Sequence, residues 1–156
     1  MPWSKVTPIL LSCDPGSLCR RPYPGHPKGC PNFGKRPTCP PQAERWTPKT
    51  IARYEWYAVW IEFGFGAHVM HMQDLHPDWS ERKCACCLYW QGMARARLRA
   101  AIVEYLRATP FSRIIKVHSV PEAHGCDVTA TMATLGVALE WPPKVMTRHV
   151  AIVRIG

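Results

Sequence analysis

Residues 28–41 read KGCPNFGKRPTCPP, and this stretch decides how the N-terminal third of the chain can fold. Eight residues separate Cys30 from Cys39, and proline follows each of the two cysteines. Proline fixes φ and cannot donate a backbone hydrogen bond, and glycine permits tight turns, so no helix or strand is expected here. Three explanations are open for cysteines placed in this way: a disulfide, a metal centre, or composition alone.

The irregular region extends on both sides of this stretch. Most of the 16 prolines lie between Pro2 and Pro48. Residues 13–48 have neither helical nor strand periodicity, and so long a loop inside a compact domain requires something that organises it. The cysteines of this region are the expected organiser, so we interpret 13–48 as a Cys/Pro-rich metal-binding segment.

Length and composition fit one folded unit. A chain of 156 residues, 47% of them hydrophobic and 20% charged, suits one domain with one core. We therefore predict a single domain over 1–156, in which 49–156 forms an α/β core beside the Cys/Pro-rich segment.

The pattern of apolar residues predicts strands and helices in alternation. Strands are expected at 5–11, 58–65, 112–120 and 147–155, where β-branched and aromatic residues gather. Helices are expected at 49–57, 80–108 and 126–139, and a loop at 66–79. For the helices at 49 and 80, Thr47 and Ser80 are the predicted N-caps. The predicted fold class is α/β, with a small mixed sheet, helices, and an irregular N-terminal segment organised by a metal centre.

The sequence also indicates a compartment. No secretory signal peptide is visible, and no run approaches the roughly 18 apolar residues of a membrane span. We expect a soluble, cytoplasmic protein without a membrane partner. Because cytoplasmic thiols stay reduced, the eight cysteines are interpreted as metal ligands or redox groups rather than as disulfides.

The net charge of +9 and the pI near 9.4 make nucleic acid a candidate partner. A basic surface without a dedicated site is the alternative, since lysine and arginine are spread along the chain. A nucleic-acid-binding module would use Arg95, Arg97 and Arg99, together with the basic residues between 20 and 36. A redox partner, if the protein has one, is not identified by the sequence.

Three cysteines of the irregular segment form the first part of the candidate metal site. Cys19, Cys30 and Cys39 lie in loops where the chain can bend around a central object, and a proline after a cluster cysteine recurs in bacterial ferredoxins. Structural zinc favours CxxC pairs, and none occurs before residue 84. The spacing therefore favours a [4Fe–4S] cluster over zinc, and cysteines without any ligand are the structural alternative.

The fourth ligand is expected from CACC (84–87), in the first turns of the predicted long helix. There the helix dipole stabilises thiolate. We choose Cys87, because Tyr89 and Trp90 could shield a cluster from water, and Cys84 is the second choice. The predicted role is redox or sulfur-related chemistry, with an open iron for substrate if only three cysteines bind; catalysis itself is left undecided.

Four stretches together resemble the domain family described as "predicted metal-binding protein". They are KGCPNFGKRPTCPP, the following ARYEWYAVWIEF, the cysteine patch CACCLYWQ, and VPEAHGCDVTATMATLGVALEWPP (120–143). The resemblance implies an iron–sulfur or other metal centre held by Cys30, Cys39 and Cys87, and it implies no particular reaction. His124 occupies the position at which the family has a cysteine, so the resemblance does not imply a cysteine ligand there.

Histidines supply weaker candidates. His68 and His71 are three residues apart, near Asp74 and His76, but a solvated loop is the favoured interpretation of that stretch. His118, Glu122 and His124 form a candidate group for acid–base chemistry. His26 lies close in sequence to the candidate cysteine ligands and is a candidate for a further ligand or a proton donor.

Overall fold

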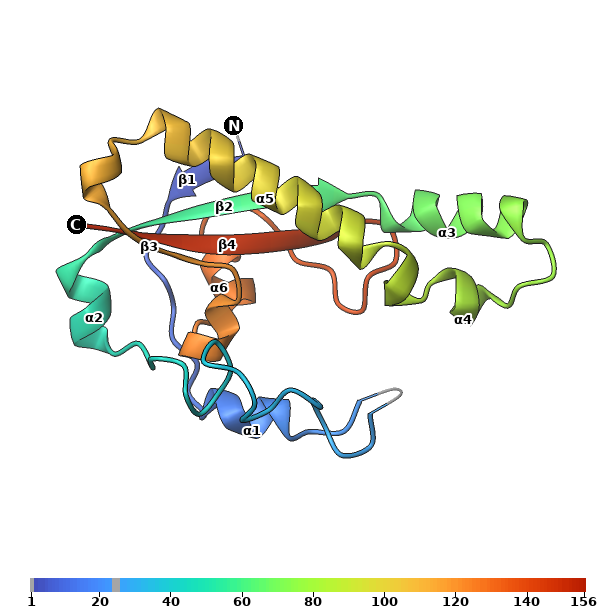
Figure 1. The fold of residues 1–156 in the computed structure, drawn as a ribbon, viewed down its shortest axis with the longest axis horizontal. Coiled ribbons are helices and arrows are strands. Elements are labelled where there is room, and N and C mark those ends of the chain that lie inside the picture. Colours follow the sequence, from blue (N-terminus) through green and yellow to red (C-terminus); the bar gives the residue numbers. More distant parts are fainter. Residues whose placement is uncertain (1, 24–25) are drawn as a thin grey trace.

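The computed structural model describes residues 2–23 and 26–156. Its centre is a four-stranded sheet in the order β1-β2-β4-β3, and every pair of neighbours is antiparallel (Figure 1). The strands are β1 (Trp3–Lys5), β2 (Glu55–Phe63), β3 (Ile114–His118) and β4 (Thr147–Ile155). The α/β class is confirmed, and the sheet is antiparallel rather than mixed.

Six α-helices surround the sheet in the described part of the chain: α1 (Pro15–Cys19), α2 (Pro48–Arg53), α3 (Phe65–Leu75), α4 (Glu81–Cys84), α5 (Gln91–Ala108) and α6 (Val128–Ala133). Three single turns of 3₁₀-helix accompany them: η1 (Cys87–Tyr89), η2 (Phe111–Arg113) and η3 (Pro121–His124). No helix in the described residues is long and apolar enough to cross a membrane.

Strand β4 is the centre of the core. It pairs with β2 along all nine of its residues, and with β3 from Ile152 to Ile155. Successive side chains of a strand point to opposite faces, so the apolar sequence of β4 supplies both sides of the sheet. Val150 and Ile152 join one buried cluster, while Ala151 and Val153 join the other.

The two faces are covered by different parts of the chain. Helix α5 crosses one face (Figure 1), where Leu98, Ile102 and Tyr105 pack on the sheet at helical spacing. Helix α6 and the end of the Cys/Pro-rich segment cover the other face, where Trp46 and Met132 are buried. The Cys/Pro-rich segment is therefore attached to the core through its C-terminal end.

The predicted strands near residues 112 and 147 are confirmed. The helix expected at 49–57 and the strand expected at 58–65 both exist, but their boundary was placed too late, because α2 ends at Arg53 and β2 begins at Glu55. Thr47 caps α2 through its hydroxyl, which accepts a hydrogen bond from the Thr50 backbone N–H, and Ser80 caps α4 in the same way. The strand expected at 5–11 is placed wrongly: β1 ends at Lys5, and Leu10 makes only an isolated bridge to Cys126.

The region predicted as a loop at 66–79 contains helix α3. Phe65 and Val69 stand four residues apart and pack with Phe63 and Trp90, so an apolar stripe holds this helix.

The single helix predicted at 80–108 is broken between α4 and α5. Cys86 has extended backbone angles, and the Trp90 indole N–H donates a hydrogen bond of 3.2 Å to the Ala85 carbonyl. Trp90 is buried against Phe63 and Phe65. The Ala85 carbonyl therefore bonds to the indole and not to a backbone N–H of a continuing helix. The next α-helix, α5, begins at Gln91.

The helix predicted at 126–139 is shorter than expected. Helix α6 ends at Ala133, and the Val137 N–H turns back to the Met132 carbonyl. Gly136, with φ of +72°, makes the left-handed bend that a C-terminal turn requires.

Candidate metal centre and adjoining cavities

Cys19 and Cys30 are brought together by a close approach of two loops. Cys19 ends α1, and its carbonyl accepts a hydrogen bond of 2.7 Å from the Cys30 N–H. Gly29 has φ of +83°, and a Cβ atom at this position would lie 2.5 Å from the Cys19 carbonyl oxygen. Only glycine therefore allows this approach without a shift of the backbone.

Cys39 lies on the neighbouring turn. Its carbonyl accepts the N–H of Ala43, which is buried, so this turn is tied to the part of the segment that reaches the core. The pKa of the Cys19 thiol is raised, first by burial and then by the charges of the Cys30 and Cys39 thiolates, while Arg20 lowers it. Cys30 and Cys39 therefore lie close enough to Cys19 for a negative charge on either of them to disfavour the Cys19 thiolate.

Cys87, from a distant part of the sequence, is linked to this group through Tyr23. It begins η1 and is exposed. The pKa of the Tyr23 hydroxyl is raised, first by desolvation and then by the thiolate charges of Cys30, Cys87 and Cys19. Tyr23 thus lies within electrostatic reach of all three cysteines, which places Cys87 on the side of the molecule where the Cys/Pro-rich segment lies.

The side chains stop short of a complete ligand set. Among residues 2–23 and 26–156, no three side chains of His, Cys, Asp or Glu are positioned to hold a metal ion as they stand. All eight cysteines are free thiols, so the disulfide explanation has no support here. Cys19, Cys30 and Cys39 are each half-buried.

The other cysteines are separated from this group. Cys84, the second choice for a ligand, is 0% exposed in the core, whereas Cys87 is exposed, and the break before α5 puts the two on different helical turns, α4 and η1. Because Cys87 precedes α5, it also lies outside the first turns of the long helix where a dipole was expected to act on it. Cys126 is 1% exposed, its sulfur lies 3.5 Å from the Thr131 hydroxyl, and burial raises its pKa to about 11.

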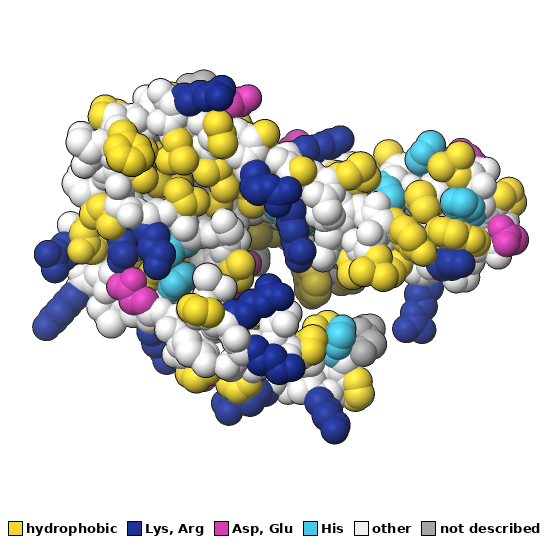
Figure 2. Space-filling model, in the orientation of Figure 1, with side chains coloured by type: hydrophobic (Ala, Val, Ile, Leu, Met, Phe, Trp, Pro, Cys, Tyr) yellow, Lys and Arg dark blue, Asp and Glu magenta, His cyan; other side chains and the backbone are white. Residues whose placement is uncertain are grey.

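Basic side chains surround the cysteine segment. Figure 2 shows Lys and Arg gathered over the lower part of the molecule, where Figure 1 places α1 and its loops. Between residues 13 and 48 the acidic residues are Asp14 and Glu44, and the basic residues are Arg20, Arg21, Lys28, Lys35, Arg36 and Arg45. Thiolates that converge on a metal bring negative charge, which this excess of cations offsets.

Beside this segment the structure joins His118 and His124, which sequence reasoning had named only as weak acid–base candidates. His118 Nδ1 lies 3.1 Å from His124 Nε2, and His124 Nδ1 bonds to the Glu44 carbonyl. The carbonyl can only accept, so His124 donates to it from Nδ1 and accepts a hydrogen bond from His118 at Nε2. His118 Nε2 then carries a lone pair, and this buried atom has no partner among the described residues.

Both imidazoles are kept neutral. Burial, the neighbouring His124, Arg154 and Lys116 together lower the pKa of His118 to about 3, and burial is the largest cause of the lowered pKa of His124. Trp46 stacks on His124 at 5.0 Å. The pair therefore fastens the segment around Glu44 and Trp46 to the end of β3.

The histidines of α3 do not form a metal site. His71 and Asp74 are exposed, and His76 stacks on Trp79 at 3.9 Å. His26, the candidate beside the cysteine ligands, packs against Tyr23 with 4.7 Å between the ring centroids.

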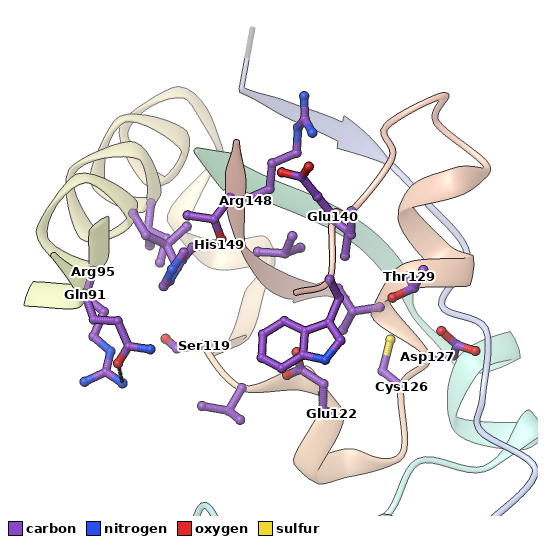
Figure 3. Close-up of a pocket in the computed structure, with 18 of the residues that line it drawn as sticks. Gln91, Arg95, Ser119, Glu122, Cys126, Asp127, Thr129, Glu140, Arg148 and His149 are labelled. Atoms are coloured by element: carbon purple, nitrogen blue, oxygen red, sulfur yellow. Dashed lines mark hydrogen bonds between the residues drawn. The ribbon is translucent and has the colours of Figure 1, made fainter. Parts of the chain in front are cut away.

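A cavity of about 700 Å³ opens between α5 and the segments around Glu122 and Glu140. Figure 3 shows Gln91, Arg95 and His149 on one side, with Cys126, Asp127 and Thr129 opposite them. Leu18 of α1 also lines it, and so does Trp90, so the cavity reaches from the residue before Cys19 to the turn after Cys87. Nothing in the sequence pattern signalled this cavity, because its lining comes from separate segments.

Comparison of the chain with family models, with curated proteins and with solved structures found no match. The resemblance to the "predicted metal-binding protein" family therefore stays a prediction.

Proposed function

We propose that the protein binds an iron–sulfur cluster through Cys19, Cys30, Cys39 and Cys87. The observation that carries this proposal is the close approach of the loops that bear Cys19 and Cys30, whose backbones are joined by a hydrogen bond of 2.7 Å next to Gly29. In agreement with this, Cys30 and Cys39 help to raise the pKa of Cys19, and Cys87 helps to raise the pKa of Tyr23. The raised pKa of Cys19 favours the protonated thiol in the metal-free protein, and a metal cation bound between these sulfurs would favour the thiolate.

Further features support an added group at this place. The hydrogen bond from Cys30 to Cys19 and the close approach at Gly29 fix the spacing of two ligands. Cys87 is exposed on η1, so its thiolate is accessible to a metal. The surrounding Lys and Arg residues offset the negative charge of a thiolate-bound cluster.

The four proposed cysteine ligands favour an iron–sulfur cluster over zinc, because structural zinc favours CxxC pairs and no such pair contributes two of these ligands. A cluster bound here would supply one-electron redox chemistry. The protein's own residues would hold it through Cys19, Cys30, Cys39 and Cys87, and the nearby Lys and Arg side chains would screen its charge.

The test is anaerobic preparation or reconstitution of the full chain with ferrous iron and sulfide, followed by iron and sulfide analysis. We expect a brown protein with absorbance at about 400 nm and close to four irons per chain, as for a [4Fe–4S] centre. A colourless protein that carries stoichiometric zinc, or one that retains no metal, would overturn the proposal.

Single variants identify the ligands. Cys19→Ser, Cys30→Ser, Cys39→Ser and Cys87→Ser should each lower the retained iron. Cys86→Ser, at the neighbour of Cys87, is the matched control and should retain the wild-type amount. Equal loss from Cys86→Ser and Cys87→Ser would remove Cys87 from the ligand set.

No specific observation in the described residues favours the alternative that the protein is a nucleic-acid-binding module. Arg95 and Arg99 line the cavity, whereas the Arg97 guanidinium lies over the Phe63 ring at 5.3 Å, so the three arginines do not form one stripe. Salt-dependent binding of DNA or RNA is the measurement that would favour this alternative.

A further inference from the structure

We propose that the cavity beside α5 binds a small organic anion, with its carboxylate or phosphate held by Arg95 and Arg99 and its apolar body against the sheet edge. The proposal is independent of the metal centre, because none of its residues is a proposed metal ligand. It rests on the shape of the sheet and on the charges that line the cavity.

The cavity exists because two neighbouring strands differ in length. Strand β4 has nine residues, but β3 stops at His118, which pairs with Ile152. From Thr147 to Ala151, the edge of β4 that faces away from β2 has no backbone partner among the described residues. Unpaired N–H and C=O groups of a strand edge are free to bond a ligand.

The wall formed by α5 is positively charged. Arg95 and Arg99 are four residues apart, so they lie on the same side of the helix. Arg95 bonds to the neutral Gln91 amide oxygen at 3.2 Å, and neither guanidinium pairs with a carboxylate in the described part of the chain. Arg95 also lies within electrostatic reach of His149, whose pKa is lowered first by burial and then by this cation.

The acidic groups of the cavity form no ion pair with this wall in the described part of the chain. Glu140 accepts hydrogen bonds from the N–H groups of 144–146, and Asp127 caps α6, so backbone N–H groups already engage each carboxylate. Glu122 lines the cavity with an exposed side chain, while desolvation of its carboxyl raises the pKa of that group. Arg148 also lines the cavity and pairs with Glu62, so Arg95 and Arg99 are the lining guanidinium groups that no carboxylate engages among the described residues.

Apolar side chains complete the site. Leu98 and Ile102 of α5, Val150 of β4 and the Trp90 ring line the space between the guanidinium groups and the sheet. A volume of about 700 Å³ is that of a small-molecule site, and such sites combine apolar walls with a few placed charges. The ligand class that fits is a metabolite-sized anion with an apolar or aromatic body.

The experiment measures binding of three compounds to the full chain by calorimetry: benzoate, phenyl phosphate and benzylamine. We expect saturable one-to-one binding of at least one of the two anions and none of the cation. The comparison of the affinities of benzoate and phenyl phosphate shows whether the site prefers a carboxylate or a phosphate. Binding of benzylamine as tight as that of the anions, or no saturable binding of any compound, would overturn the proposal.

Variants locate the binding. The double variant Arg95→Gln/Arg99→Gln should weaken anion binding by at least about tenfold, since a charged hydrogen bond contributes roughly 1.5–3 kcal/mol. Arg97→Gln, on the same helix but outside the cavity, is the matched control and should bind as wild type. Equal weakening by both changes would show a diffuse charge effect and reject the site.

The same measurements on metal-free and reconstituted protein separate the two proposals. Anion binding by metal-free chain supports the cavity whatever the outcome for the cluster. Circular dichroism of each variant checks that α5 is intact, so that a loss of binding is assigned to the arginines.

Discussion

Accessibility divides the eight thiols into distinct chemical groups. Cys84 and Cys126 are buried, whereas Cys87 is exposed. In reduced, metal-free protein we expect iodoacetamide to modify Cys87 first, and Cys84 and Cys126 only after unfolding, because alkylation requires contact with the thiolate. Peptide mass spectrometry over time gives the order.

Reconstitution with iron and sulfide should change this order. Cys19, Cys30, Cys39 and Cys87 should become protected, while Cys86 stays reactive and serves as the internal control. Rapid alkylation of Cys84 in the folded protein would contradict the placement of α4 in the core.

At the scale of one element, the capping box of α2 offers a clean test. The Thr47 hydroxyl accepts from the Thr50 N–H at 3.2 Å, and the Thr50 hydroxyl accepts from the Thr47 N–H at 3.3 Å. Thr47→Ala should lower the free energy of unfolding by about 1 kcal/mol in urea denaturation, because it leaves an N–H of the first turn without a partner. Thr47→Ser keeps the hydroxyl and should retain most of the stability; equal losses from both changes would reject the cap.

The cysteine loops allow a comparison of two glycines. Gly29 and Gly34 both have positive φ, but a Cβ at Gly29 would lie 2.5 Å from the Cys19 carbonyl oxygen, whereas a Cβ at Gly34 would meet nothing within 4 Å. Gly34→Ala should cost about 1–2 kcal/mol of backbone strain. Gly29→Ala should cost more and also lower the retained iron, as measured by denaturation and metal analysis.

The two glycine variants should therefore differ in metal content and not only in stability. If Gly34→Ala lost as much iron as Gly29→Ala, general loosening of the segment would explain both results, and the contact between Cys19 and Cys30 would have no special role.

Elements with strong local signals were predictable from sequence. The β-branched run of β4 and the Thr47-Pro48 start of α2 gave bounds close to those observed. The break before α5 was not predictable, because it depends on the Trp90 indole reaching back to Ala85 while packed between Phe63 and Phe65. Such a tertiary contact overrides a helical pattern that is continuous in the sequence.

The candidate site was predictable only in part. Spacing and composition pointed to Cys19, Cys30 and Cys39, since all lie in one segment. The pairing of His118 with His124, and the cavity beside Arg95, depend on where β3 ends relative to β4. The register of β3 against β4 is set in the folded sheet, and the sequence of neither strand alone indicates it.

For the whole molecule, acid should release the attachment between the Cys/Pro-rich segment and the sheet. The pKa of His118 is lowered from 6.5 to about 3 in the folded protein. As the pH falls below about 6.5, His118 is therefore protonated in the unfolded chain and stays neutral in the folded chain. The free energy of unfolding should therefore fall with pH between about 6 and 4, by up to about 1.4 kcal/mol per unit for this group. The lowered pKa of His124 acts in the same direction.

Denaturant titrations at several pH values measure this slope. His118→Gln should reduce it, because one group that is protonated only in the unfolded state has been removed. His71→Gln, on exposed surface of α3, is the control and should keep the wild-type slope. An unchanged slope in His118→Gln would mean that other groups govern acid sensitivity.

The position of β4 in the chain also has a consequence for biosynthesis. It lies between β2 and β3 in the sheet, yet it follows both of them in the sequence. A nascent polypeptide that has emerged only as far as α6 holds β2 and β3 with no strand to join them, so the sheet closes only after β4 has left the ribosome. Until then the cysteines upstream of β4 have emerged before the strand that completes the core, so their thiols are accessible to solvent at a stage when the sheet is incomplete.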